Sequence, residues 1–323
     1  MSLILTVTRA CNLRCSYCPT AKDGWPSLSV DQALQGLRLY AARGGGDLKL
    51  FGGEPLLVPE VVKAVMDEAE TTPEIRRVYL STNGLGLNRA WLARIARSEK
   101  SILTISLDGA PEDNRRFRRT LHDDVPDAYD HIMRLREDIL RTPRVVITQT
   151  IPPASASRAA QNFEHLLDLG FRRFNLLPGY YIPWRMDQLM ALQRGFNEIG
   201  ERIRDIWASG GNLYLRNLYT WAPTPFFNTG FVVDSDGTIH PSNLGLSSKL
   251  DDLRAQTQVG TLDDPPSPEA LAEKTELVNQ LLRDNLDEGV WESTQTVDAM
   301  LTELCRSLYG SWAERRRAAE RVA

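Results

Sequence analysis

The stretch that decides the fold is Leu3-Ile4-Leu5-Thr6-Val7-Thr8-Arg9-Ala10-Cys11-Asn12-Leu13-Arg14-Cys15-Ser16-Tyr17-Cys18. Its first six residues are apolar or β-branched, which is the composition of a buried β-strand. Three cysteines then follow within eight residues. They therefore lie on a loop at the carboxyl end of the first strand, the position at which parallel α/β folds place their chemistry.

Outward from this stretch, β-rich runs alternate with runs of helical period, which predicts βα units and a parallel sheet. The candidate strands are Leu3–Thr8, Leu48–Phe51, Arg77–Leu80, Ile102–Leu107, Val145–Thr150 and Phe174–Leu177. The candidate helices, with Ser29 and Asn88 as capping residues, are Val30–Ala42, Val58–Glu70, Arg89–Arg97, Asp127–Asp138, Ala159–Leu169 and Met186–Ile206. Six such units predict an α/β fold, a partial (β/α)6 TIM-like barrel.

The pattern changes after residue 208, where glycines and prolines separate short β-like pieces. These pieces are centred on Leu213–Leu218 and Phe231–His240, and two helical stretches follow near Glu269–Asp284 and Val297–Arg317. We expect a core barrel over residues 1–208. A small C-terminal α+β appendage, made of a β-hairpin plus helices, is expected over residues 209–323.

Composition excludes several classes of protein. The chain has 323 residues, of which 42% are hydrophobic and 25% are charged, enough for a large core. No apolar run approaches the roughly 20 residues that cross a bilayer, and the first residues do not resemble a signal peptide. The formal net charge is −4, which argues against a nucleic-acid partner. We expect a cytoplasmic protein that binds neither membrane nor nucleic acid.

The layout of the cysteines favours metal ligation over disulfides, because the fourth one, Cys305, lies far along the chain. Thiolates are soft ligands that suit iron–sulfur clusters or zinc. Three thiolates on a cubane of four irons leave one iron free to bind substrate. A structural zinc site is the alternative. Its fourth ligand would be Cys305 or one of His122, His131, His165 and His240.

Four more motifs stand at the ends of predicted strands. They are Gly52-Gly53-Glu54-Pro55, Ser81-Thr82-Asn83-Gly84, Ser106-Leu107-Asp108-Gly109 and Phe174-Asn175-Leu176-Leu177-Pro178. Glycine at a strand end lets the main chain approach a ligand closely, because it lacks a Cβ atom. Arg118 follows Ser106 by twelve residues within a cluster of arginines. Such a cluster is typical of a solvated helix face, with a carboxylate clamp as the alternative.

Together these motifs resemble the radical S-adenosylmethionine superfamily, in its peptide-modifying branch. The resemblance implies that Cys11, Cys15 and Cys18 bind one [4Fe–4S] cluster, whose open iron binds S-adenosylmethionine. It also implies that the glycine motif binds the amino group of that cofactor and that Arg118 pairs with its carboxylate. The residues expected to contact the cofactor, with a core leucine as the alternative for the last, are Tyr17, Gly52, Gly53, Glu54, Ser81, Asn83, Ser106, Asp108, Arg118 and Leu177.

Many relatives in this superfamily carry a C-terminal cysteine-rich domain, called SPASM or twitch, that holds auxiliary clusters. Residues 227–242 resemble its first hairpin, with Asp236-Gly237 as the turn. Phe227 and Ser242, however, stand where cysteines are expected. We therefore expect a degenerate domain and no auxiliary cluster. Without a second cluster to accept an electron, two outcomes are favoured: a redox-neutral one such as epimerisation or rearrangement, or an oxidation that returns its electron to the first cluster.

The resemblance implies an enzyme that cleaves S-adenosylmethionine and abstracts a hydrogen atom from a peptide or small-molecule substrate in natural-product modification. An electron donor such as flavodoxin or ferredoxin is the expected partner. Cys305 is a candidate hydrogen donor, although its helical spacing with leucines favours core packing. The alternative function is a sugar- or nucleoside-tailoring enzyme of antibiotic biosynthesis. A non-catalytic iron–sulfur redox sensor is a remote alternative.

Overall fold

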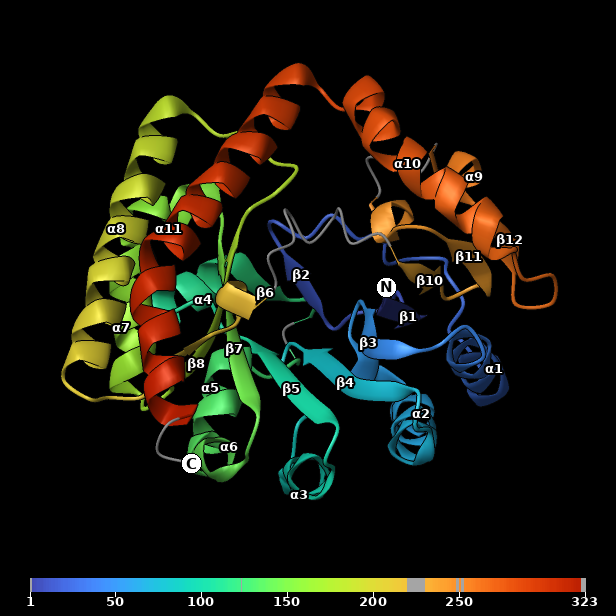
Figure 1. Cartoon of the computed structure of the whole chain (residues 1–323), viewed down its shortest axis with the longest axis horizontal. Helices are drawn as coiled ribbons and strands as arrows, with labels where there is room; N and C mark the ends of the chain where they lie inside the picture. The colour runs from blue at the N-terminus through green and yellow to red at the C-terminus, as the bar shows by residue number, and fades with distance from the viewer. Residues whose placement is uncertain (1, 123, 220–229, 248–249, 251–252, 321–323) are drawn as a thin grey trace. The chain divides into compact units, whose positions relative to one another are not determined.

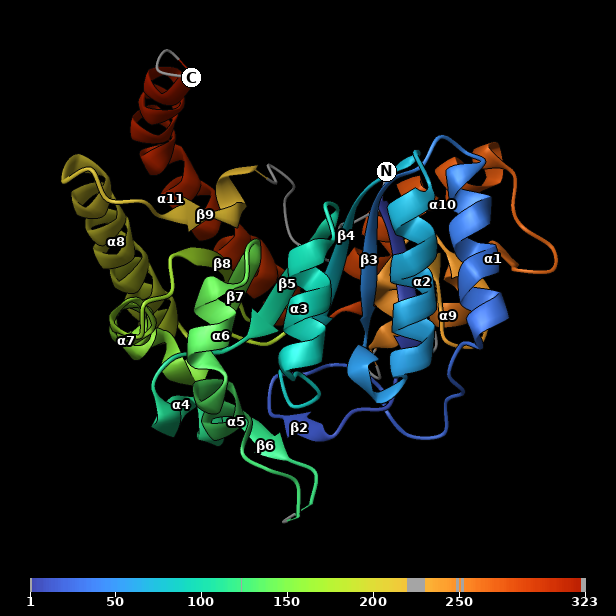
Figure 2. The same cartoon turned by 90° about the horizontal axis from the view of Figure 1, so that it is seen from below.

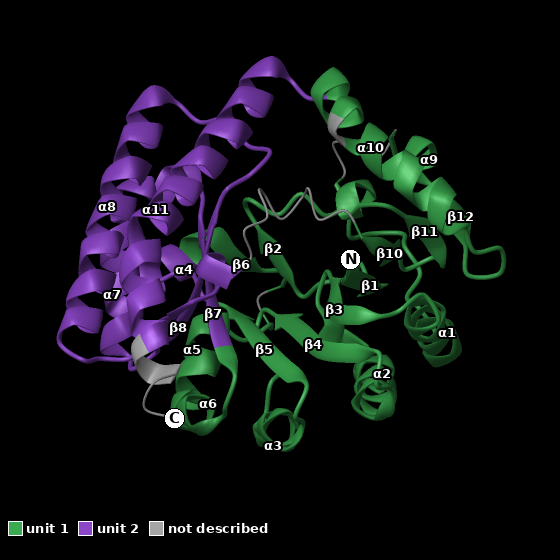
Figure 3. Cartoon of the chain, viewed as in Figure 1, with its two compact units in different colours: residues 1–106, 115–145, 225–285 green, residues 107–114, 146–224, 286–323 purple. Residues whose placement is uncertain are grey.

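The computed structural model describes residues 2–122, 124–219, 230–247, 250 and 253–320. The chain forms two compact units, which Figure 3 distinguishes by colour. Unit 1 comprises residues 1–106, 115–145 and 225–285, and unit 2 comprises residues 107–114, 146–224 and 286–323. Each unit is therefore assembled from segments that are far apart in the sequence.

Unit 1 is built on parallel strands (Figure 1). In the sheet order β1, β3, β4 and β5, these are Ser2–Thr8, Gly46–Gly52, Ile75–Thr82 and Ser101–Ser106. Residues 3–8 of β1 are all buried, because a strand inside a parallel sheet is covered on both faces. That double burial is the reason for the nearly continuous apolar run at the start of the sequence.

A hairpin from the C-terminal half of the chain extends this sheet beside β1. Strand β10 (Phe231–Val233) pairs parallel with β1, and β11 (Thr238–His240) pairs antiparallel with β10. Strand β12 (Gly260–Thr261) pairs antiparallel with β11. The predicted turn is present, and Gly237 has a φ of +83°, which glycine adopts at little cost. The position of the hairpin next to the first strand was not evident from the sequence.

Three helices cover one face of the central strands of unit 1 (Figure 1), namely α1 (Val30–Ala41), α2 (Pro59–Thr71) and α3 (Arg89–Arg97). Both predicted caps are confirmed. The Ser29 hydroxyl accepts from the N–H of Gln32 at 3.2 Å, and the Asn88 side chain accepts from the N–H of Trp91 at 3.1 Å. The other helices of unit 1 are η1 (Pro55–Leu57), α5 (Ala128–Arg134), α6 (Arg136–Arg141), η5 (Asn243–Leu246), α9 (Arg254–Thr257) and α10 (Pro268–Asn285).

Two local features differ from the prediction. The helix expected over Asp127–Asp138 is divided into α5 and α6, because Leu135 has a φ of −98° and a ψ of 0°, which interrupts the helical hydrogen bonds. A small antiparallel ribbon of β2 (Leu13–Cys15) and β6 (Arg118–Thr120) was missed, and so was α4 (Pro111–Phe117). Strands of three residues are too short to produce a recognisable alternation of apolar and polar side chains.

Unit 2 is built on β7 (Val145–Ile151), β8 (Arg173–Pro178) and β9 (Tyr214–Leu215), which pair parallel in that order. Its helices are η2 (Pro153–Arg158), α7 (Ala159–Asp168), α8 (Met186–Ala208), η3 (Arg216–Tyr219) and α11 (Glu288–Glu320). The long helix α8 packs against both α7 and α11. All six predicted strands of the chain are thus present, and each one lies within about two residues of its expected bounds.

The region predicted as an appendage contributes to both units, since residues 225–285 belong to unit 1 and residues 286–323 to unit 2. The boundary expected at residue 208 falls inside unit 2, which includes residues 146–224, and the domain division stays a prediction. Among the described helices, none has the length and apolar character needed to cross a membrane.

Candidate metal and cofactor site

The candidate site is the loop that follows β1 in unit 1. Its three cysteines, Cys11, Cys15 and Cys18, are free thiols, and each is half-buried. The N–H of Cys18 donates to the carbonyl of Cys15 at 3.1 Å, and the N–H of Leu13 donates to Sγ of Cys11 at 3.4 Å. These bonds hold the loop in a tight turn. The loop carries three soft ligands within eight residues of the sequence.

The chemistry of the donor set fits a cluster. Burial raises the pKa of the Cys11 thiol, while the hydrogen bond from Leu13 and the charge of Lys22 act in the opposite direction. Ligation requires the thiolate, so metal binding there releases a proton. Within the described parts of the chain, no three His, Cys, Asp or Glu side chains gather around one position for a single metal ion. A cubane cluster needs a different ligand geometry. Each thiolate binds its own iron, so the three sulfur atoms do not have to surround one position.

The ribbon of β2 and β6 joins the cysteine loop to Arg118. Cys15 lies opposite Arg118 in this antiparallel pair, and the N–H of Ser16 donates to the carbonyl of Phe117 at 2.9 Å. Arg118 is only 7% exposed, and its guanidinium carbon lies 5.5 Å from the centre of the Tyr17 ring, within cation–π range. Arg118 therefore begins a strand and is buried, so the helix-face alternative for it is wrong.

The glycine motif at the end of β3 packs against the segment that leads into the cysteine loop. The N–H of Gly53 donates to the carbonyl of Thr8 at 2.8 Å. A Cβ atom on Gly52 would lie 2.0 Å from the Thr8 oxygen, and one on Gly53 would lie 2.2 Å from the Ala10 oxygen. Only glycine fits, because two backbones meet here. Binding of the cofactor's amino group by this motif stays a prediction.

Glu54 and Asn83 connect the ends of β3 and β4 with the cysteine loop. The buried Glu54 carboxylate accepts from Thr82 Oγ1 at 2.8 Å and from the N–H of Asn83 at 2.7 Å. Burial raises the pKa of Glu54, and these hydrogen bonds oppose that shift. Asn83 Nδ2 donates to Asn12 Oδ1 at 2.7 Å and lies 3.8 Å from Cys11 Sγ. Asn83 thus contacts both Asn12 and the first cysteine.

Sequence reasoning missed a buried arginine just before the first cysteine. Arg9 is fully buried, and it donates from Nε to Asp234 at 3.2 Å and from Nη2 to the carbonyl of Gly245 at 2.9 Å. Its guanidinium carbon lies 3.6 Å from the centre of the Trp25 ring, and that of Arg254 lies 4.7 Å from the same ring. This network fastens the hairpin to the cysteine loop. No local signal could reveal it, because Arg9 and Asp234 are 225 positions apart.

Four other predicted contact residues are divided between the units. Ser81 and Ser106 are half-buried in β4 and β5 of unit 1. Asp108 belongs to unit 2, where its buried carboxylate accepts from the N–H of Thr150 at 3.1 Å. Leu177 is half-buried in β8 of the same unit. The observed role of Asp108 is to hold a strand end, and the cofactor contacts of all four stay predictions.

Cys305 lies in α11 of unit 2 and is half-buried. Burial raises the pKa of its thiol to about 11, so the sulfur keeps its proton at neutral pH. Nearby, the Tyr180 hydroxyl donates to Asp298 Oδ1 at 3.3 Å. A role for Cys305 as hydrogen donor stays a prediction. Of the two positions where auxiliary-cluster cysteines were expected, Ser242 is buried and Phe227 lies outside the described residues.

Comparison with known sequences gives one family match and a set of relatives. The model of the radical SAM superfamily matches residues 5–180. The GTP 3′,8-cyclase of Stenotrophomonas maltophilia (strain R551-3) is 38% identical over 130 residues, which are 39% of this chain and 39% of that protein. The chain therefore spans about two fifths of the length of this curated relative.

Two solved structures share the fold over nearly the whole chain. The structure described as "Native anSMEcpe with bound AdoMet" has a TM-score of 0.72 and 16% identity, and the match covers 96% of this chain and 98% of that one. The structure of the same protein "with bound AdoMet and Kp18Cys peptide" has a TM-score of 0.71 with the same identity and coverage. At this identity the likeness concerns the fold alone. It confirms the predicted α/β class, with a partial (β/α)6 barrel and a C-terminal part that includes helices.

Proposed function

The chain belongs to the radical SAM superfamily, and from that premise we propose that it cleaves S-adenosylmethionine reductively and takes a hydrogen atom from a substrate. Cys11, Cys15 and Cys18 hold one [4Fe–4S] cluster, and its fourth iron is left for the cofactor. When bound, the cluster and S-adenosylmethionine supply one-electron reduction and a 5′-deoxyadenosyl radical. The residues of the chain bind these groups, orient them and exclude water.

The observation that carries the proposal is the burial of Arg118 opposite Cys15. The guanidinium of this buried arginine, whose residue pairs with Cys15, is a fork of N–H donors that matches a carboxylate, which is the group that the cofactor's methionine moiety presents. Tyr17 lies near this guanidinium and restricts its orientation. A non-catalytic redox sensor would need the thiols but not the arginine, so the enzyme is the better-supported function.

A peptide is the proposed substrate class. It is supported by the shared fold with a structure that contains both AdoMet and a peptide. We further propose a redox-neutral outcome, such as epimerisation, because Ser242 supplies a hydroxyl where an auxiliary cluster would need a thiolate. In that outcome Cys305 is the proposed donor that returns a hydrogen atom to the substrate, and its thiol is protonated as this role requires.

A nucleoside or nucleotide substrate is the second candidate. It is favoured by the 38% identity over 130 residues with a relative named GTP 3′,8-cyclase. The two substrate classes are separated by incubating the reduced enzyme with GTP or with candidate peptides and analysing the products by mass spectrometry. For an epimerised peptide made in D2O, we expect a mass increase of one deuterium, because the S–H of Cys305 exchanges with solvent.

The experiment that tests the activity is anaerobic reconstitution, followed by iron and sulfide analysis and an assay for 5′-deoxyadenosine. We expect about four irons per chain and cleavage of S-adenosylmethionine. Cys15→Ala should abolish both, whereas the matched variant Cys305→Ala should keep the cluster. A count near eight irons would contradict the single-cluster proposal. Absence of 5′-deoxyadenosine from a fully loaded protein would contradict the activity itself.

A further inference from the structure

The ribbon of β2 and β6 has a second face, away from the cysteine. Alternate residues of a strand point to opposite faces, so Cys15 and Arg118 share one face while their neighbours Arg14 and Arg119 share the other. Arg14 lies directly opposite Arg119. Arg119 is exposed, and the Arg14 side chain is 34% exposed. Figure 2 shows the two strands side by side at the lower edge of unit 1.

This pair of arginines is unfavourable in isolation, because like charges directly opposite each other destabilise an antiparallel pair. Asp23 accepts a hydrogen bond from Arg14 Nη2 at 2.8 Å, but it is 87% exposed. An exposed ion pair of this kind contributes only about 0–1 kcal/mol. Arg119 Nε donates to the carbonyl of Arg116 at 3.3 Å, which offers no opposing charge. Among the described residues, no carboxylate is paired with Arg119, and Arg14 has the exposed Asp23 and the Cys11 carbonyl as partners, so the described part of this face keeps an excess of positive charge.

The sequence around the ribbon extends the positive charge. Residues 14–23 and 115–124 together contain six arginine or lysine residues and three aspartates, in a chain whose formal net charge is −4. Of these six, Arg115 is paired with Asp127 and Asp130, and Arg118 is buried on the other face of the ribbon. Arg116 is exposed next to the ribbon. Lys22 donates to the carbonyl of Leu13 at 2.8 Å, and its charge acts on the Cys11 thiol. The cationic surface thus reaches to the ligands of the cluster.

We propose that the arginine face, formed by Arg14 and Arg119 of the ribbon together with the exposed Arg116 just before it in the chain, is the docking surface of an acidic one-electron carrier protein. The inference rests on the proposed function, since only an enzyme that reduces its cluster needs such a carrier. One electron leaves the carrier's cofactor, which is oxidised, and reduces the cluster, and no bond forms or breaks. Only the backbone of the ribbon separates this face from Cys15. Docking here leaves the face with Arg118 free for S-adenosylmethionine.

The test uses the reconstituted full-length enzyme, with flavodoxin as the carrier. The variant Arg116→Glu/Arg119→Glu reverses two charges on the arginine face and changes no cluster ligand. A second variant, Arg116→Gln/Arg119→Gln, removes the charges without introducing new ones, and it should show an intermediate effect. Dithionite, a small reductant that needs no docking surface, reports on whether the cluster of each variant is intact.

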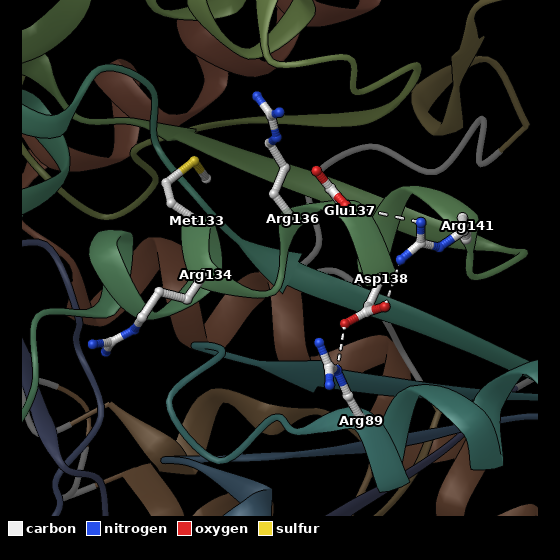
Figure 4. Close-up of a pocket in the computed structure, with 7 residues that line it drawn as sticks. All are labelled: Arg89, Met133, Arg134, Arg136, Glu137, Asp138 and Arg141. Carbon is white, nitrogen blue, oxygen red and sulfur yellow. Dashed lines mark hydrogen bonds and ion pairs between the residues drawn. The ribbon is translucent and has the colours of Figure 1, made fainter.

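A matched control places the same change of net charge elsewhere on unit 1. A surface pocket of about 240 Å³ between α3, α5 and α6 is lined by Arg134 and Arg136 among other residues. Figure 4 shows both of these side chains pointing away from Asp138, which binds two other arginines of the pocket. Arg134→Glu/Arg136→Glu therefore changes the total charge equally and leaves the pocket's ion pairs in place.

Two quantities are measured, the Kd for flavodoxin by calorimetry and the rate of cluster reduction by stopped-flow absorbance. For the reversed variant we expect at least about a tenfold rise in Kd and a similar loss of flavodoxin-driven rate, with reduction by dithionite unchanged. Added salt should weaken flavodoxin binding to the unmodified enzyme more than to the variant.

Equal Kd and rate in the reversed variant and the unmodified enzyme would overturn the docking surface, and so would an equal loss in the control pair. Failure of the unmodified enzyme to form 5′-deoxyadenosine with dithionite would instead overturn the proposed function. In that event, comparing the Kd for flavodoxin between the reversed variant, the control pair and the unmodified enzyme still tests whether the arginine face is the docking surface.

Discussion

Arg118 lies directly opposite Cys15 in the ribbon of β2 and β6, so a cation and a proposed cluster ligand are held in register by backbone pairing. Paired residues of an antiparallel ribbon have Cα atoms about 4.5–5.5 Å apart. Backbone pairing therefore sets where the Arg118 side chain begins, and its guanidinium carbon lies 5.5 Å from the centre of the Tyr17 ring.

Replacing Arg118 should weaken cofactor binding. Lysine keeps the charge but loses the planar fork of donors, so we expect Arg118→Lys to raise the Kd for S-adenosylmethionine by about ten- to a hundredfold. Calorimetry on the reconstituted protein measures this. Arg119→Lys, one residue later and on the other face of the ribbon, is the matched control and should leave this Kd unchanged. Equal effects in the two variants would remove the specific role of Arg118.

Adding a methyl group at Gly53 should distort the cysteine loop. Its Cβ would lie 2.2 Å from the Ala10 oxygen, so we expect Gly53→Ala to lower the free energy of unfolding by several kcal/mol and to reduce the iron content after reconstitution. Gly24 has a positive φ, but open space surrounds it. Gly24→Ala should cost only about 1 kcal/mol. Urea unfolding of both variants, together with iron analysis, checks the difference.

Removing the partner of Arg9 should leave a buried charge without compensation. We expect Asp234→Asn to destabilise the chain by about 3–5 kcal/mol, the usual cost of breaking a buried pair. The exposed pair of Arg185 and Asp187 provides the comparison, and Asp187→Asn should cost less than about 1 kcal/mol. Denaturant unfolding at neutral pH measures both. A loss at Asp234 no larger than at Asp187 would show that the network is not a structural anchor.

The stability of the chain should fall in mild acid because of His240. The ring is buried and bonded to Thr238 Oγ1 at 2.9 Å and to Thr257 Oγ1 at 3.2 Å. Burial lowers its pKa from 6.5 to about 4, even though the charge of Asp234 opposes the shift. The unfolded chain therefore takes up a proton before the folded one. Stability is full above about pH 6.5 and is lost as the pH falls toward 4, by a total on the order of 3 kcal/mol.

Urea unfolding at several pH values between 7.5 and 4.5 tests this dependence. His240→Gln should remove most of the decline between pH 6.5 and 4.5, because the buried imidazole whose pKa is lowered is then absent. The exposed His122 is the control, and His122→Gln should keep the decline. An identical decline in His240→Gln and in the unmodified chain would assign it to other groups.

Much of the candidate site could be predicted from short stretches of sequence. The spacing of Cys11, Cys15 and Cys18 indicates three soft metal ligands on one loop. The glycines at the end of β3 indicate a position that has no room for a side chain. The same stretches do not show which atoms occupy the space beside these glycines. The structure places the Thr8 and Ala10 carbonyls there, and a contact between two loops has no signature in either loop alone.

The sequence by itself determined the six main strands, most of the helices with their caps, and the cysteine loop, because periodicity, turn residues and ligand spacing all act within about ten to fifteen positions. Only the tertiary structure decided that Arg118 pairs with Cys15, that the hairpin joins β1, and that Arg9 is neutralised by Asp234. These contacts join segments up to 225 positions apart. Which distant segments meet depends on how the strands pair and pack, and no local pattern encodes that.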